Sequence, residues 1–143
     1  MVSYEKSCGA VIYTNVDNTI KYVIIKSIEG IYGFPKGHME KDETEYDTAK
    51  REIFEEVGLD VEFIPGFRTI DIHPLPKKRN VMKKAVYFLA KFEDQQLKYQ
   101  KEELLGAYLM TYDEIINKFQ YDSSKRILME ANDFIKDKFL GEK

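Results

Sequence analysis

Apolar and β-branched residues dominate two short runs near the N-terminus, residues 7–13 and 22–25, and turn-forming residues fill the segment 15–19 between them. Two such runs joined by a turn are typical of a β-hairpin, so we expect them to pair antiparallel. Residues 29–43 then lose all periodicity and contain three glycines and a proline, which predicts a long, shaped loop. Ordered loops of this length usually serve a functional site.

A helix is predicted between Thr44 and Gly58. Thr44 can cap its N-terminus with Asp47 as partner in a variant of the capping box, and Gly58 stands where a glycine commonly ends a helix. The apolar residues that recur at helical spacing, and are expected to face the core, are Tyr46, Ala49, Ile53 and Val57.

The second half of the chain alternates between strand-like and helix-like segments. The strand-like segments are 61–72, 85–92 and 107–110, and the helix-like segments are 112–119 and 123–139. A basic, proline-bearing connection, PLPKKRN, joins the first two strands. This order indicates an α/β fold with a mixed sheet and helices on its faces. At 143 residues the chain is long enough for one good core and too short for two, so we expect a single domain over residues 1–143.

Charge and cysteine content narrow the classes of function. The net charge of -3 gives no overall attraction to nucleic acid, so a phosphate-bearing partner has to be held by a metal or by a few placed cations. The single cysteine, Cys8, excludes an internal disulfide and is expected to be buried and unreactive. No apolar run approaches the roughly 18 residues of a membrane span, and the first residues do not resemble a signal peptide, so we expect a cytoplasmic protein.

Three glutamates of the predicted helix could bind a metal ion. Glu52, Glu55 and Glu56 occupy positions i, i+3 and i+4, so their carboxylates gather on one face, beside the apolar stripe. Like charges at this spacing repel, but a divalent cation reverses the sign of the interaction, and hard oxygen ligands suit Mg²⁺ or Mn²⁺. No histidine or cysteine cluster offers zinc a site. A solvated acidic face is the alternative interpretation of the cluster taken alone.

A longer pattern surrounds these glutamates and favours the metal site. It reads as a glycine, five residues, a glutamate, seven residues, and then arginine, glutamate, aliphatic, any, glutamate, glutamate, any, glycine, aliphatic. The positions that fit are Gly37, Glu43, Arg51, Glu52, Ile53, Glu55, Glu56, Gly58 and Leu59. This segment resembles the Nudix box, and seven fixed identities with two apolar positions should arise by chance far less than about once in a million chains.

The resemblance to Nudix hydrolases implies a fold and a set of residue roles. The fold is an α/β/α sandwich with a mixed sheet, on which the box forms a loop, a helix and a loop. The metal ligands it implies are Glu52, Glu55, Glu56 and the carbonyl of Gly37. Glu43 and Arg51 take structural roles, as an ion pair that braces the loop against the helix and preserves ligand geometry.

The family commonly takes one more acidic residue, as metal ligand or general base, from a loop well after the box. Here the segment EELLGAYL offers Glu102 and Glu103, and an alignment that places Leu109 where relatives often have tryptophan favours Glu103. An ordinary exposed loop pair is the alternative. Glu52 and Glu103 are the two candidates for the general base.

The segment IYGFPKGHME resembles the PKGH-containing lead-in of diadenosine tetraphosphate hydrolases. Lys36 is therefore expected to donate to a distal phosphate. Lys83 and Lys84 match a lysine-bearing segment that faces phosphates in those relatives, and strand register decides which of them turns inward. The tyrosine that some relatives place against adenine has no clear match near Ile72 and His73, which leaves the base-recognition residues undefined.

The resemblance implies magnesium-dependent hydrolysis of a phosphoric anhydride bond, with diadenosine tetraphosphate cut to ATP and AMP as the preferred reaction and Mn²⁺ as an alternative cofactor. Three other activities share the box and remain alternatives: nucleoside triphosphate pyrophosphatase, ADP-ribose hydrolase and RNA 5′-end pyrophosphohydrolase. A non-catalytic nucleotide-binding module is a further alternative, although such modules often lose a box glutamate. The expected partner is a small nucleoside polyphosphate, without membrane or nucleic acid, and the protein is expected to be a monomer or a homodimer.

Overall fold

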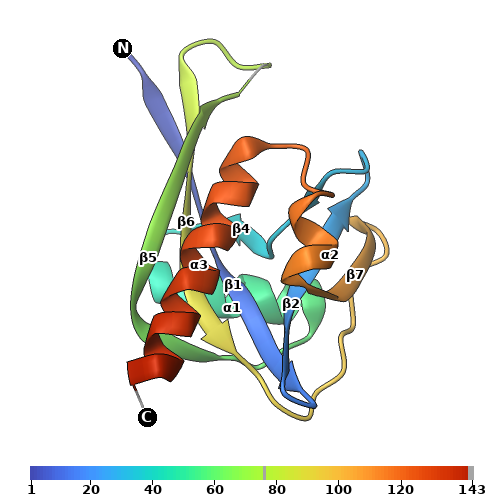
Figure 1. Ribbon diagram of the computed structural model, residues 1–143. Coiled ribbons are helices and arrows are strands. Elements are labelled where there is room, and N and C mark those ends of the chain that lie inside the picture. The colour runs from blue at the N-terminus through green and yellow to red at the C-terminus, as the bar shows by residue number, and fades with distance from the viewer. Residues whose placement is uncertain (76, 142–143) are drawn as a thin grey trace.

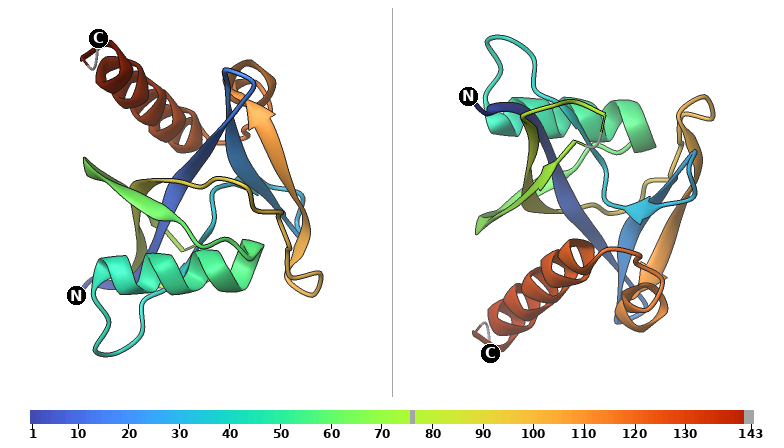
Figure 2. Two further views of the ribbon diagram at one scale, coloured as in Figure 1. Left: turned by 90° about the horizontal axis from the view of Figure 1, so that it is seen from below. Right: turned by 90° about the horizontal axis from the view of Figure 1, so that it is seen from above.

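The computed structural model describes residues 1–75 and 77–141 and consists of one mixed sheet with helices on both faces (Figure 1). Its strands are β1 (Ser3–Val16), β2 (Thr19–Ser27), β3 (Tyr32–Gly33), β4 (Lys36–His38), β5 (Glu62–Pro74), β6 (Val81–Lys91) and β7 (Leu104–Thr111). Its helices are α1 (Glu45–Val57), α2 (Tyr112–Ile116) and α3 (Asp122–Gly141). Helix α1 covers one face of the sheet, whereas α3 packs on the other (Figure 2).

The long strand β1 lies at the centre of the sheet. It runs parallel to β6 and antiparallel to β2 and β4, while β5 pairs with β6, and β3 and β7 pair with β2. The predicted hairpin is confirmed as β1 and β2. Asp17 and Asn18 form its turn with φ of 51° and 69°, the left-handed conformation that a tight hairpin turn requires.

Side chains of the central strands alternate between two cores. On β6, Tyr87 and Leu89 pack with α3, whereas Val86 and Phe88 pack on the α1 side. The same alternation along β1 sends Val11 toward α3. Because both faces of the sheet are buried, the molecule is the α/β/α sandwich predicted from the sequence.

Three details differ from the sequence-based expectations. The region 29–43 is not all loop, because residues 7–9 of β1 extend beyond its pairing with β2 and bind β4. Helix α2 ends at Ile116, three residues before the predicted end. Tyr46 faces the core only in part: its ring stacks on that of buried Phe88 with centroids 4.1 Å apart, but the residue lies in the first turn of α1 and is 46% exposed.

Glu45 fastens the first turn of α1 to the sheet. Its carboxylate accepts hydrogen bonds from Nε and Nη2 of Arg68 on β5, at 2.9 and 2.8 Å, and lies 2.6 Å from Nζ of Lys6 on β1. The hydrogen bonds from Arg68, and then that from Lys6, lower the pKa of Glu45 to about 2. The ionised carboxylate therefore links three elements that are distant in the sequence.

We expect Glu45→Gln to lower the free energy of unfolding by about 1–2 kcal/mol near pH 7, because the bonds to Arg68 and Lys6 lose their charge. The folded pKa lies below the ordinary value of 4.5, so this stabilisation is present above about pH 4.5 and is lost as the pH falls toward 2. Urea denaturation of both proteins at several pH values measures the difference. A difference in unfolding free energy that stays constant down to the lowest pH would contradict this account. Glu29→Gln, which removes the same charge from an exposed position, serves as the control.

Candidate active site

Both ends of α1 have the caps predicted from the sequence. Oγ1 of Thr44 accepts from the backbone N–H of Asp47, and a side-chain oxygen of Asp47 accepts from the N–H of Thr44, each at 3.1 Å. Gly58 ends the helix in the left-handed conformation with φ of 72°. Local signals therefore determine where the helix begins and ends, and hence which side chains it turns toward the loop.

The three box glutamates differ sharply in burial. Glu55 is exposed, Glu52 is half-buried and Glu56 is only 9% exposed, with its Oε1 buried and without a hydrogen-bond partner. Burial raises the pKa of Glu56 to about 7, and it also raises the pKa of Glu52. The expectation that all three lie beside the buried stripe is wrong for Glu56, because it stands three residues after buried Ile53 and next to buried Val57, on the side of α1 that packs on the sheet.

Arg51 connects the loop before α1 to the carboxylates. Its Nε and Nη2 donate to Glu43 at 2.7 and 2.9 Å, and Nη2 also donates to the carbonyl of His38 at 3.0 Å. Its Nη1 donates to Glu52 at 2.8 Å and lies 3.3 Å from Glu55. The hydrogen bonds from Arg51 are the main reason why the pKa of Glu43 falls to about 2. The ion pair that the resemblance implied is thus present and spans from loop to helix.

Within residues 1–75 and 77–141, no three Asp, Glu, His or Cys side chains come together in a metal-binding geometry. The physical reason is that Arg51 holds Glu52 and Glu55, whereas Glu56 points inward. The residues nevertheless suit a small hard cation. A side chain at Gly37 would overlap the carboxylate of Glu52, so only glycine allows this close approach of backbone and carboxylate. Together with the unpartnered oxygen of Glu56, this gives a donor set made only of oxygens.

Strand register decides whether Lys83 or Lys84 lies on the same face of the sheet as Lys36. Lys36 pairs with Gly9 of β1, and Gly9 pairs with Tyr87 of β6, so these positions share the face that packs on α3. Lys83, four residues before Tyr87, lies on that face, whereas Lys84 lies on the α1 face. Burial lowers the pKa of Lys36, the charge of Lys83 lowers it further, and Glu56 opposes both. Lys36 and Lys83 therefore lie near each other, and the register does not place Lys84 with them.

The segment before β7 packs against the end of α1. The N–H groups of Lys98 and Gln100 donate to the carbonyls of Val57 and Glu56 at 2.9 and 3.3 Å. The next turn carries Glu103, which is exposed and whose charge raises the pKa of both Glu52 and Glu56. This turn therefore brings Glu103 to the box.

Sequence analysis overlooked Asp71. On β5 it pairs with Ala85 and so lies on the same face as Lys83, where its carboxylate is 3.3 Å from Nδ1 of His73. The negative charge of Asp71 raises the pKa of Lys36, against the effects of burial and of Lys83. The alternation of Thr69, Asp71 and His73 with isoleucines was the available signal, because polar residues at every second position share one face of a strand.

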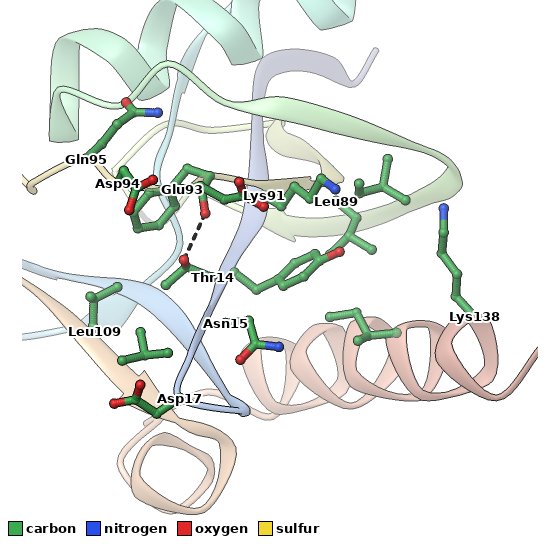
Figure 3. Close-up of a pocket in the computed structure, with 15 residues that line it drawn as sticks. Thr14, Asn15, Asp17, Leu89, Lys91, Glu93, Asp94, Gln95, Leu109 and Lys138 are labelled. Carbon is green, nitrogen blue, oxygen red and sulfur yellow. Dashed lines mark hydrogen bonds between the residues drawn. The ribbon is translucent and has the colours of Figure 1, made fainter. Parts of the chain in front are cut away.

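A cavity of about 630 Å³ lies at the opposite end of β1 (Figure 3). It is lined by Tyr13, Leu89 and Ile135 among others, and Thr14 at its edge donates to the carbonyl of Phe92 at 2.8 Å. The charged residues around it are mixed in sign: Asp17, Glu93, Asp94, Lys91 and Lys138. Since Tyr13 stands five residues beyond Cys8, the partner of Gly37, this part of the cavity lies roughly 15 Å from Gly37, and the mixed charges do not favour a polyanion.

Comparison with known proteins identifies the family. The NUDIX domain matches residues 6–131. The chain belongs to the Nudix family. The resemblance noted in the sequence is confirmed, and with it a pyrophosphohydrolase. Within the described residues, no helix of this Nudix chain is long and apolar enough to cross a membrane.

Several relatives of this Nudix enzyme align along nearly its whole length. The bis(5'-nucleosyl)-tetraphosphatase (asymmetrical) of Sus scrofa is 30% identical over 143 residues, which cover 91% of this chain and 95% of that protein. The Rattus norvegicus protein of the same name is 28% identical over 142 residues, with the same coverage. The crystal structure of a C. elegans Ap4A hydrolase binary complex superimposes with a TM-score of 0.85 at 20% identity, covering 93% of this chain and 98% of that one.

Proposed function

We propose that this Nudix enzyme hydrolyses diadenosine tetraphosphate to ATP and AMP with Mg²⁺ as cofactor and Mn²⁺ as a substitute. The observation that carries the proposal is the full-length similarity to asymmetrical bis(5'-nucleosyl)-tetraphosphatases, at 28% and 30% identity. The site supports it, because Lys36 lies near Glu56 and Lys83 lies near Lys36, so two cations extend from the box, where a polyphosphate needs its charge neutralised.

In this proposal the metal is held by Glu52, Glu55, Glu56, Glu103 and the carbonyl of Gly37. When bound, divalent ions neutralise phosphate charge and lower the pKa of a coordinated water. Lys36 and Lys83 bind phosphate oxygens, since ammonium groups act as point charges toward phosphate. Arg51 and Glu43 keep the loop carbonyls and the helix carboxylates in fixed relation. Water attacks phosphorus and a carboxylate accepts its proton, while the anhydride P–O bond breaks and the second nucleotide leaves, so that ATP and AMP are formed.

Glu103 is the preferred proton acceptor. The alternative, Glu52, already accepts a hydrogen bond from Nη1 of Arg51 at 2.8 Å, so its Oε1 would have to give up this donor before it could accept a proton from water. Glu103 is exposed to solvent and its charge acts on Glu52, so its carboxylate lies near the box and can reach an attacking water.

We expect Glu103→Gln to lower kcat by about 100-fold or more, within the range of a lost general base, while Glu102→Gln changes kcat by less than about threefold. The two variants remove the same charge from adjacent exposed positions, so they control for each other. Steady-state hydrolysis of diadenosine tetraphosphate measures both. Equal effects of the two substitutions would exclude Glu103 as the base.

The proposed substrate is tested by product analysis in ¹⁸O-labelled water, which reports both the substrate and the phosphorus attacked. The panel is diadenosine tetraphosphate, dGTP, ADP-ribose and capped RNA, each with Mg²⁺. We expect the highest kcat/KM for diadenosine tetraphosphate. ATP and AMP should be its only products, and only one of the two should carry the ¹⁸O label. A higher kcat/KM for another compound, or symmetrical cleavage to two molecules of ADP, would overturn the proposal.

A further inference from the structure

The turn between β5 and β6 carries three consecutive cations, Lys77, Lys78 and Arg79, and all three are exposed. We call these three residues the basic arm. The whole chain has a net charge of -3, so this concentration of positive charge is local. Within residues 1–75 and 77–141, Lys77 and Arg79 form no ion pair, whereas Lys78 does. Two cations of the arm are therefore available to an external anion.

The basic arm directly follows the strand positions of the phosphate site. His73 of β5 pairs with Lys83 of β6, and one step further the N–H of Leu75 donates to the carbonyl of Val81 at 3.0 Å. The N–H of Lys78 then donates to the carbonyl of Leu75 at 3.2 Å, which closes the turn. The arm thus starts four residues after His73 and ends four residues before Lys83.

Lys78 brings the arm back over the face of the sheet that holds Lys36. Its Nζ lies 2.8 Å from the carboxylate of Glu5, and Glu5 pairs in register with Lys83. The pKa of Glu5 falls mainly through the hydrogen bond from Lys78, and the charges of His38 and Lys83 lower it further. Glu5 is consequently surrounded by the arm, β4 and β6, and it fixes the arm beside Lys83.

These contacts form a row of cations. Lys36 lies level with Tyr87, and Lys83 lies four residues further along β6, or about 13 Å at the usual rise of a strand. The arm continues the row in the same direction, away from the glutamates of α1. An extended polyanion that begins at the box and passes Lys36 and Lys83 would meet Lys77 and Arg79 next.

We propose that the basic arm is a subsite for the distal phosphates of a linear polyphosphate, bound by charge-assisted hydrogen bonds from Lys77 and Arg79 to phosphate oxygens. This inference rests on the proposed function, which it deepens by making chain length a determinant of affinity. Substrates with more phosphates between their nucleosides gain contacts on the arm, whereas shorter ones end before it.

The first test compares Lys77→Ala/Arg79→Ala with the charge-matched control Lys118→Ala/Lys136→Ala, whose residues are exposed elsewhere. Lys78 is kept because it anchors the arm. We expect the arm variant to raise KM for diadenosine hexaphosphate by about tenfold and that for diadenosine triphosphate by less than about twofold, with kcat unchanged and the control like wild type. An equal rise in KM for both substrates, or for both variants, would refute the subsite.

The second test does not depend on hydrolysis. Calorimetric titration of inorganic tripolyphosphate in EDTA at low salt should show a dissociation constant about tenfold weaker for the arm variant than for wild type and the control. Identical constants for all three proteins would overturn the inference. So would an arm variant that loses affinity only for a 5′-triphosphorylated RNA oligonucleotide and not for tripolyphosphate. If no dinucleotide is hydrolysed, the proposed function fails, but this titration still decides whether the arm binds polyphosphate.

Discussion

Glu56→Gln is expected to lower kcat by about a thousandfold or more and to leave the protein folded. The substitution replaces a charged oxygen donor with a neutral amide of the same shape, so the charge that would hold a divalent ion and its phosphates is lost. Glu56 is 9% exposed, and its Oε1 has no hydrogen-bond partner, so the ionised side chain is costly to bury. The free energy of unfolding in EDTA should therefore fall by less than about 1 kcal/mol, or rise.

This combination distinguishes a ligand from a structural residue. A side chain needed only for packing would lose activity together with stability. Three measurements separate these cases: kcat with saturating Mg²⁺, urea denaturation in EDTA, and calorimetric titration with Mn²⁺. The exposed Glu29→Gln removes the same charge outside the site and should leave all three unchanged. A kcat within about tenfold of wild type would remove Glu56 from the set of ligands.

Local signals explain why much of the box could be read from the sequence. The capping box of Thr44 and Asp47, and the left-handed Gly58, each involve residues at most four positions apart, so sequence spacing alone determines them. The ion pair of Arg51 with Glu43 spans only eight residues and belongs to the same motif. These contacts join residues close in the sequence, and the structure contains all of them.

Contacts between distant segments could not be read in the same way. The burial of Glu56 depends on how α1 docks on the sheet, and the choice between Lys83 and Lys84 depends on the register of β6 against β1. The strand β4 exists only because the edge of β1 at residues 7–9 is open to it. A periodicity taken along one segment carries no information on such pairings.

The role of Arg51 is tested by Arg51→Lys, which keeps the positive charge but replaces the planar guanidinium group, with its several N–H donors, by a single ammonium group. Arg51 serves acceptors in three places: the Glu43 carboxylate, the His38 carbonyl, and the carboxylates of Glu52 and Glu55. A lysine side chain has one nitrogen and cannot donate to all of these acceptors at once. We expect kcat to fall by about 10- to 100-fold, as for lost outer-shell support of metal ligands, and the free energy of unfolding to fall by about 2 kcal/mol.

Arg126→Lys is the matched control for this prediction. Arg126 also donates to several acceptors, the hydroxyl of Thr69, the carbonyl of Ile70 and the carboxylate of Glu130, but it does so on α3, away from the box. Its substitution should lower stability without changing kcat or the affinity for Mn²⁺. If Arg51→Lys behaved in the same way, Arg51 would contribute only to folding. A fall in Mn²⁺ affinity confined to Arg51→Lys would show that its hydrogen bonds position the carboxylates, since the charge is unchanged in both variants.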